Sequence, residues 1–217
     1  MQVEYIEHYG TDLSVVNAAR VSFDRESAFI TNDEGHPTLS ERDIKLIHYL
    51  AKHKHTSCFE HQGATLRLKV PIFIARQIQR HRTFSYNEVS RRYVDTPPEF
   101  FWPDKWRKRA DNVKQGSSEE EVDFDAAGYA KSAALVALEV YERLLDEGAA
   151  PEQARMILPQ NMYTEFYMTG NLRNWAHFLK LRLDGHAQKE VQDVAQMVEE
   201  ILRPLFPVSV EALMTYD

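Results

Sequence analysis

Arginine is concentrated in one short segment of this chain. Residues 80–92 read RHRTFSYNEVSRR, and from Arg76 to Arg92 there are five arginines but only one acidic residue, Glu88. The chain as a whole has a formal net charge of −7. A guanidinium group matches the oxygens of a phosphate with two parallel hydrogen bonds. The segment therefore predicts a site for a phosphorylated ligand, and a solvated basic face without a ligand is the alternative.

Short polar side chains are interleaved with these arginines. If the chain is extended here, Glu88, Ser90 and Arg92 point to one side. Arginine and serine on that side suit a phosphate, and the glutamate suits a ribose or a backbone group. Ser90 is also a nucleophile by type, but no base is evidently paired with it, so we favour phosphate binding.

An apolar segment precedes the arginines and is expected to anchor them to the core. From Ala64 to Val70, apolar and polar residues alternate with the period of a half-buried strand. Pro71 then opens a short helix that runs through about Gln79, because proline is favoured at the first helical position. Arg76 and Arg80 stand four residues apart and are expected to share one face of that helix.

Periodicity along the rest of the chain predicts a helix-dominated α+β (mixed α/β) fold, with a central sheet and flanking helices. We expect a single domain over residues 1–217. Further strands are predicted at 3–8 and 162–168, and loops at 30–38, 97–106 and 111–125, the last acidic and mobile. Helices are predicted after Thr11-Asp12, from a capping box at Thr38-x-x-Glu41, at about 129–148, at 151–158, from Asn171 to about 183, and from about 187 to Pro204.

Composition narrows the class of protein. No apolar run approaches the ~18 residues that a membrane helix needs, and the first residues lack the layout of a signal peptide. The single cysteine, Cys58, fits a reducing compartment, so we expect a cytoplasmic protein without a membrane partner. The glycines are too scattered for a glycine-rich phosphate loop, so a nucleotide must be held by side chains and helix ends. The acidic balance argues against general nucleic-acid binding.

Beyond these patterns, the arginine-rich segment resembles the signature of flavin-dependent thymidylate synthases. It contains Arg-His-Arg followed after seven residues by Ser90, and it fits the fuller form RHRxxSxNExSxR at every specified position. Six other blocks resemble that family in the same order: AARVSF at 18–23, HKHTSCFEH at 53–61, PIFIARQ at 71–77, ARMILP at 154–159, NLRNWAHFLKLR at 171–182 and HAQKE at 186–190. The resemblance thus extends over nearly the whole chain.

This resemblance implies an enzyme that reductively methylates dUMP to dTMP on bound FAD. It also implies 5,10-methylenetetrahydrofolate as the carbon donor and NADPH as the reductant of the flavin. No metal site is implied. The expected assembly is a homotetramer whose active sites are shared between subunits.

The resemblance further assigns site residues, position by position. Arg182 matches a catalytic arginine that favours ionisation at N3 of the uracil ring, a sensible role because a fixed cation stabilises the ring anion. His81 is a candidate proton carrier, but hydrogen bonding to the flavin is the expected role. The FAD-contacting positions correspond to Ser57, Arg80, His81, Arg82, Glu88, Asn171, Arg173 and His177. The dUMP-contacting positions correspond to Gln77, Arg80, Glu88, Ser90, Arg92, Arg155 and Arg182.

Other residues suggest different chemistry. Cys58 is a nucleophile by type, as in the folate-only thymidylate synthases, but a packed thiol is the expected role. A weak zinc signal comes from His53, His55, Glu60 and His61.

Aromatic residues suit stacking on a flavin or folate ring, loop packing or a subunit contact. They are Phe100, Phe101, Trp102 and Trp106. Two rival functions follow: a metal-dependent nucleotide hydrolase that uses the histidines, and an RNA-binding module that combines the arginine segment with these aromatic residues.

Overall fold

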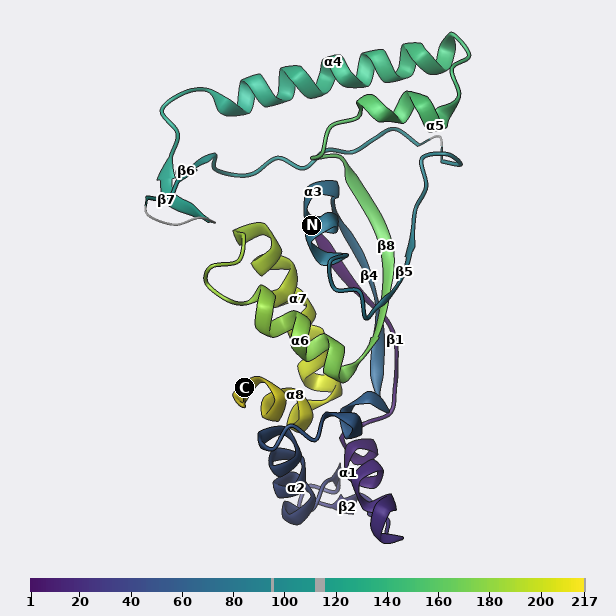
Figure 1. The fold of residues 1–217 in the computed structure, drawn as a ribbon, viewed down its shortest axis with the longest axis vertical. Helices are drawn as coiled ribbons and strands as arrows, with labels where there is room; N and C mark the ends of the chain where they lie inside the picture. Colours follow the sequence, from purple (N-terminus) through teal and green to yellow (C-terminus); the bar gives the residue numbers. More distant parts are fainter. Residues whose placement is uncertain (95, 112–115, 217) are drawn as a thin grey trace.

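The computed structural model describes residues 1–94, 96–111 and 116–216. Its centre is a four-stranded sheet in the order β1-β4-β8-β5, in which every neighbouring pair is antiparallel (Figure 1). The strands are β1 (Gln2–Tyr9), β4 (Gly63–Pro71), β5 (Ser85–Glu88) and β8 (Tyr163–Asn171). The predicted α+β fold with a central sheet is confirmed, and the three predicted strands are present, each longer than expected.

The two faces of this sheet differ in polarity. On β4, Leu66 and Leu68 are fully buried, whereas Arg67 between them is exposed. On β8, Met168 and Phe166 lie opposite these two leucines and are also buried. One face therefore belongs to the core, as the alternation in the sequence predicts.

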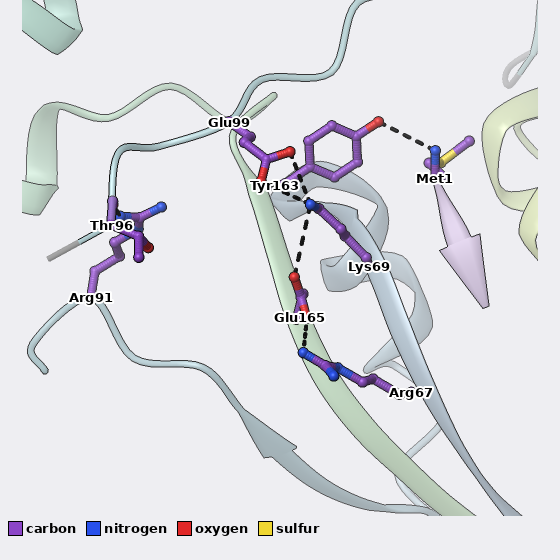
Figure 2. A network of polar contacts seen from close by, with 8 residues as sticks. All are labelled: Met1, Arg67, Lys69, Arg91, Thr96, Glu99, Tyr163 and Glu165. Carbon is purple, nitrogen blue, oxygen red and sulfur yellow. Dashed lines mark hydrogen bonds and ion pairs between the residues drawn. The ribbon is translucent and has the colours of Figure 1, made fainter. Parts of the chain in front are cut away.

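Charged residues connect the strands on the opposite face, as Figure 2 shows. Lys69 on β4 donates hydrogen bonds of 2.9 Å to both carboxylate oxygens of Glu99, and its ammonium group lies 3.9 Å from the carboxylate of Glu165 on β8. Arg67 forms an ion pair with the same Glu165. Each exposed pair contributes only about 0–1 kcal/mol, but together the pairs favour the observed register of β4 and β8.

Three C-terminal helices cover the apolar face of the sheet. They are α6 (Leu172–Arg182), α7 (Lys189–Leu205) and α8 (Pro207–Thr215), which lie on one side of the strands in Figure 1. The predicted cap of α6 is confirmed, because the side chain of Asn171 accepts a hydrogen bond of 3.0 Å from the N–H of Asn174. The buried indole of Trp175 donates to the carbonyl of Ala64 over 3.1 Å and joins α6 to β4.

The sequence does not predict α8, because it ends the last helix at Pro204. In the structure Pro204 lies inside the last turn of α7, and α8 begins at Pro207. The buried carboxylate of Asp12 accepts hydrogen bonds from the N–H groups of Val208 (2.9 Å) and Ser209 (3.0 Å). This cap comes from the other end of the chain, so no local pattern could indicate it.

The N-terminal helices form a second group below the sheet in Figure 1. Its elements are α1 (Asp12–Arg20), η1 (Val21–Phe23), β2 (Ile30–Thr31), β3 (Pro37–Thr38), α2 (Glu41–Lys52) and η2 (Thr56–Glu60). The helix predicted after Thr11 is confirmed. The predicted capping box at Thr38 is wrong, since Ser40 caps α2 by accepting a hydrogen bond of 3.2 Å from the N–H of Asp43. The predicted loop at 30–38 contains β2 and β3, which pair with each other.

Helix α3 (Ile72–Ile78) is the predicted short helix before the arginine-rich segment. Pro71 is its N-cap rather than its first residue. The helix ends two residues before Arg80, so the expectation that Arg76 and Arg80 share one helix face is wrong.

The remaining elements extend beyond one end of the sheet. They are β6 (Arg107–Arg109), β7 (Ser117–Glu121), α4 (Ala126–Asp146), α5 (Pro151–Ala154) and η3 (Arg155–Ile157). Helix α4 ends before Gly148, as predicted, and the helix predicted at 151–158 is a single α-helical turn followed by a 3₁₀ turn. The predicted acidic connection at 111–125 contains β7, and residues 112–115 lie outside the described residues.

Much of the apolar stripe predicted on α4 is uncovered. Tyr141 packs in a small cluster with Leu158 and Met162, but Tyr129 is 73% exposed and Val136 is 60% exposed. A row of exposed apolar side chains on one helix is a feature of surfaces that bind another protein. Neither α4 nor any other helix that the structure describes is long and apolar enough to cross a membrane.

Candidate active site

His81 and Arg182 form the centre of the candidate site. His81 follows α3, and Arg182 is the last residue of α6. Arg182 donates two hydrogen bonds of 3.0 Å, from Nε to Nε2 of His81 and from Nη2 to the backbone carbonyl of Gln77. Because both bonds start from one rigid planar group, they hold the guanidinium in a single orientation.

The surroundings of His81 keep its imidazole neutral. The residue is 6% exposed, and its ring lies edge-on to the rings of Phe178 (5.1 Å) and His177 (5.7 Å). Burial first, and then the charges of Arg182 and His177, lower the pKa of His81 to about 4. Since Nε2 accepts a hydrogen bond, the ring proton is on Nδ1. His81 is therefore suited to orient Arg182 at neutral pH, which argues against the alternative role of proton carrier.

A further arginine, Arg80, lies near this pair. Burial and the nearby charge of Arg80 lower the pKa of Arg182. Arg80 and Arg82 are exposed and form no ion pair with any residue in the described ranges. Guanidinium groups that repel one another gain most from an anion placed between them, so this position favours an anionic ligand.

Several residues matched to flavin contacts lie along α6. The side chain of Asn174 donates to the carbonyl of Thr83 over 2.8 Å and holds the RHR segment against that helix. Arg173 forms an ion pair of 2.5 Å with Glu60, which brings η2 next to the start of α6. As predicted for positions four apart, Arg173 and His177 are both exposed on this helix. Of the predicted flavin set, Asn171, Arg173 and His177 belong to α6 and its cap, and His81, which Arg80 and Arg82 flank, contacts His177. Ser57 lies in η2 and lines a separate cavity with Cys58, and Glu88 lies apart from α6.

A polar cavity of about 590 Å³ adjoins Arg182 and is called the glutamine cavity below. Gln77 of α3 and Gln188, which precedes α7, line it together with Arg182. Arg107 and Ser117 line it from β6 and β7. Two residues matched to dUMP contacts, Gln77 and Arg182, therefore share one cavity.

A second cavity, of about 410 Å³, is richer in charge and is called the arginine cavity below. It is lined by Arg76, Arg91 and Arg155 together with Glu88 and Glu152. The carboxylate of Glu88 is already held, because it accepts hydrogen bonds from the side chains of Thr164 (2.6 Å) and Gln79 (3.0 Å). Glu88 and Arg155 are the two dUMP-matched residues that line it.

Ser90 and Arg92 lie in a turn rather than in a strand. Strand β5 ends at Glu88, and the N–H of Tyr93 donates to the carbonyl of Ser90 over 2.9 Å. The expectation that Glu88, Ser90 and Arg92 point to one side is therefore wrong, because it required an extended backbone. Arg92 is paired instead with Glu152, at 3.4 Å between Nε and Oε2.

Four of the seven dUMP-matched residues are divided between these two cavities of one chain. Arg76 and Gln77 are neighbours on α3, and successive helical residues point about 100° apart, so they line different cavities. Gln77 and Arg182 belong to the glutamine cavity, and Glu88 and Arg155 to the arginine cavity. Within the described part of a single chain, neither of these two cavities contains both sets.

Comparison with known proteins identifies the family. A family model described as thymidylate synthase complementing protein matches residues 4–208. A flavin-dependent thymidylate synthase of Thermus thermophilus is 42% identical over 207 residues, which cover 95% of this chain and 73% of the relative. The chain belongs to the flavin-dependent thymidylate synthase family.

Further proteins match at similar levels. The flavin-dependent thymidylate synthase of Kosmotoga olearia is 38% identical over 217 residues, covering 99% of this chain and 90% of the relative. The crystal structure of the UMP/dUMP methylase PolB from Streptomyces cacaoi, bound with 5-Br dUMP, superposes with a TM-score of 0.83 and 35% identity over 99% of this chain and 95% of that one. The resemblance seen in the arginine-rich signature is thus confirmed across the whole chain.

The residues that suggested other chemistry have structural explanations. Cys58 packs against the core, and burial raises the pKa of its thiol, which makes it a poor nucleophile. It lines a cavity of about 890 Å³ together with Ser57. In residues 1–94, 96–111 and 116–216, no three histidine, cysteine or acidic side chains are grouped to hold a metal ion. Membership of a thymidylate synthase family also disfavours the two rival functions, a metal-dependent nucleotide hydrolase and an RNA-binding module.

The aromatic loop packs on the protein itself. The ring of Phe101 lies 6.0 Å from that of Phe73 on α3 and 6.2 Å from that of Tyr163 on β8. Phe100 lies against Trp102 at 6.1 Å. Of the roles considered for these residues, loop packing therefore applies to Phe100, Phe101 and Trp102.

Three residues next to the site receive no role from the sequence. Gln188 and Glu190 lie in the block HAQKE, so the family resemblance contained a signal for them. Arg107 lies outside every family block and gave none. In the structure Arg107 and Gln188 line the glutamine cavity, and Glu190 contacts both of them.

Proposed function

We propose that this protein reductively methylates dUMP to dTMP with bound FAD. The observation that carries this proposal is the pairing of Arg182 with a buried, neutral His81 inside a chain of this family. The relatives named above are flavin-dependent thymidylate synthases, and the PolB structure is that of a UMP/dUMP methylase bound with a dUMP analogue.

In this proposal Arg182 acts on the uracil ring. A guanidinium held in one orientation stabilises negative charge on the ring, at the cost of little reorganisation during the reaction. The ring carbon that accepts the methyl group then becomes electron-rich without a covalent bond to the enzyme. The raised pKa of the Cys58 thiol supports this route, because the described chain has no other cysteine to serve as a nucleophile.

The phosphate of dUMP is assigned to the arginine cavity and its rim. Arg155 lines this cavity, and Arg92 and Ser90 lie beside it through the contact of Arg92 with Glu152. Charge-assisted hydrogen bonds from such groups contribute about 1.5–3 kcal/mol each. Several of them are enough to hold a nucleotide at micromolar concentration.

The residues along α6 fit FAD. Arg80 and Arg82 form no ion pair with the described residues, so they are available for its diphosphate. Arg173 and His177 on α6, and Ser57 on η2, complete the proposed contacts. Bound FAD, once reduced by NADPH, would supply a hydride, and methylenetetrahydrofolate would supply the methylene carbon and leave as tetrahydrofolate. Methylene plus hydride gives the methyl group, and C5 of uracil gives up its proton.

We further propose a homotetramer whose active sites are shared between subunits. The exposed apolar side chains of α4, among them Tyr129, Leu135, Val136 and Val140, support an interface between copies. The division of the dUMP-matched residues between two cavities supports sites that combine one cavity from each of two chains. A cytoplasmic location is part of the same proposal and is supported by the free thiol of Cys58.

Spectroscopy of the purified protein tests the proposed function. The protein is expected to carry flavin absorbance that NADPH bleaches under anaerobic conditions. Addition of dUMP together with methylenetetrahydrofolate is expected to restore the oxidised spectrum while dTMP forms. A colourless protein that neither retains added FAD nor forms dTMP would overturn the proposal.

A further inference from the structure

A chain of side-chain hydrogen bonds runs behind Gln77. The amide Nε2 of Gln77 donates to Oε1 of Gln188, and Nε2 of Gln188 donates to Oε2 of Glu190 over 2.8 Å. The other carboxylate oxygen of Glu190 accepts a hydrogen bond of 2.5 Å from Arg107. Arg107 is held in turn by Ser117, whose hydroxyl accepts from Nε over 2.6 Å.

The direction of every bond in this chain is set at its acidic end. An ionised carboxylate only accepts hydrogen bonds, so Gln188 must turn its NH₂ group toward Glu190. Its carbonyl oxygen then points to Gln77, and this oxygen only accepts. Gln77 must therefore turn its own NH₂ group toward Gln188. A flipped amide at either glutamine would place two acceptors against each other.

Glu190 is well suited to fix this polarity. The residue is 7% exposed. Burial alone would raise the pKa of Glu190, but the hydrogen bonds from Arg107 and Gln188 outweigh it and hold the pKa below its ordinary value. The carboxylate thus stays ionised at neutral pH, and its charge is balanced by Arg107.

The free end of this series of hydrogen bonds is the side-chain carbonyl oxygen, Oε1, of Gln77. No hydrogen bond to this oxygen comes from the residues that the structure describes, and it is not among their buried unpaired polar atoms. Gln77 lines the glutamine cavity beside Arg182, which presents N–H donors. The cavity therefore offers an acceptor and a donor side by side.

We propose that Glu190, through Gln188, is a positioning residue that holds the side-chain oxygen Oε1 of Gln77 toward the glutamine cavity, where it accepts a hydrogen bond from an N–H or O–H group of the nucleotide. This inference rests on the proposed function, because it takes the nucleotide to be dUMP. It assigns roles to Glu190 and Gln188 that differ from direct contact with any ligand.

A variant that no longer fixes the direction of these hydrogen bonds tests the inference. Glu190→Gln keeps the shape of the side chain but can donate or accept, so the amides behind Gln77 are free to flip. The dissociation constant of dUMP for the FAD-loaded protein is expected to rise about tenfold, or about 1.4 kcal/mol. FAD content is expected to stay at the wild-type level.

An exchange of the two residues provides the rescue. In the double variant Gln188→Glu/Glu190→Gln, the carboxylate is at position 188 and accepts from Gln77. The amide is at position 190, where its NH₂ group donates to that carboxylate and its oxygen accepts from Arg107. The original direction at Gln77 is restored, so dUMP affinity is expected to return to within about threefold of wild type, a difference of less than 1 kcal/mol. A role limited to packing would not give such a rescue.

A second route avoids dependence on the exchange variant. Gln188→Leu removes the hydrogen bonds between Gln77 and Glu190, so it is expected to weaken dUMP binding as much as Glu190→Gln does. The double variant is expected to bind dUMP no more weakly than either single variant. Glu200→Gln removes a charge from the exposed side of the same helix and is expected to leave dUMP binding unchanged.

Two results would overturn the inference. One is wild-type affinity for dUMP in the Glu190→Gln variant, and the other is additive losses from Gln188→Leu and Glu190→Gln. Failure of the proposed function itself looks different, because the wild-type protein would then bind no dUMP and form no dTMP.

Discussion

Arg182 donates from its Nε to Nε2 of His81 over 3.0 Å, and this contact joins two segments of the candidate site that are distant in sequence. Arg182 belongs to α6 near the C-terminus, whereas His81 belongs to the signature segment after α3. The bond uses one of the five N–H donors of the guanidinium, and the backbone carbonyl of Gln77 accepts from another. The remaining donors are available to a ligand in the adjoining cavity.

Replacement of Arg182 tests its proposed role on the uracil ring. Arg182→Ala is expected to lower dTMP formation at saturating dUMP by roughly 100-fold or more, which is the usual effect of removing one preorganised donor to a developing anion. Flavin retention is expected to persist, because the proposed FAD contacts are made by other residues. Full turnover in this variant would remove Arg182 from the mechanism.

Arg92 and Glu152 give a pair of opposite expectations. Arg92→Ala is expected to raise the KM for dUMP roughly tenfold or more through loss of a charged phosphate contact. The carboxylate of Glu152 lies 3.4 Å from Arg92 and competes with that phosphate, so Glu152→Gln is expected to lower the KM by about twofold to fivefold, as for removal of an exposed ion pair. Steady-state kinetics with varied dUMP measures both. An unchanged KM in Arg92→Ala would mean that the phosphate lies elsewhere.

The pKa of His81 predicts how stability depends on pH. It is about 4 in the folded protein against 6.5 for an ordinary histidine. The unfolded chain therefore takes up a proton near pH 6.5 that the folded chain takes up only near pH 4, and stability falls as the pH drops between these values. The loss from this group amounts to at most about 3 kcal/mol.

His81→Gln removes this proton but keeps an acceptor for Arg182. Urea unfolding of wild type and variant at several pH values between 6.5 and 4 is expected to show a flatter decline for the variant. Identical slopes would contradict the buried, neutral state of His81.

Mixing two inactive variants tests whether sites are shared. Arg155→Ala damages the arginine cavity and Arg182→Ala damages the glutamine cavity. If each site takes one cavity from each of two chains, hybrid tetramers from an equal mixture contain some intact sites. Random assembly then restores about a quarter of wild-type activity, because each cavity is intact in half of the chains. Activity no higher than that of the separate variants would mean that each site lies within one chain.

Local patterns predicted most of the elements that hold the site. The alternation in β4, the proline before α3 and the asparagine cap of α6 were each readable, because the residues that determine them are neighbours in sequence. The amphipathic pattern of α4 was also readable. It could not reveal that Val136 is exposed in a single chain, since periodicity identifies an apolar face but not what covers it.

The failures have two physical causes: contacts between distant parts of the chain, and local choices of cap and turn that residue spacing alone does not decide. Helix α8 depends on a cap from Asp12, and the turn at Ser90 replaced an extended segment whose side-chain directions had been inferred from spacing. Family resemblance named Arg182 and His81 separately. That they contact each other, and that burial keeps His81 neutral, follows only from the fold.

Omission of each component in turn tests the central claim most directly. Purified protein is incubated with dUMP, methylenetetrahydrofolate, NADPH and FAD, and then without each one, and dTMP is measured by chromatography. We expect dTMP from the complete mixture and none when dUMP, the folate, NADPH or, for protein stripped of flavin, FAD is left out. No dTMP from the complete mixture, or undiminished dTMP without FAD and NADPH, would contradict the account.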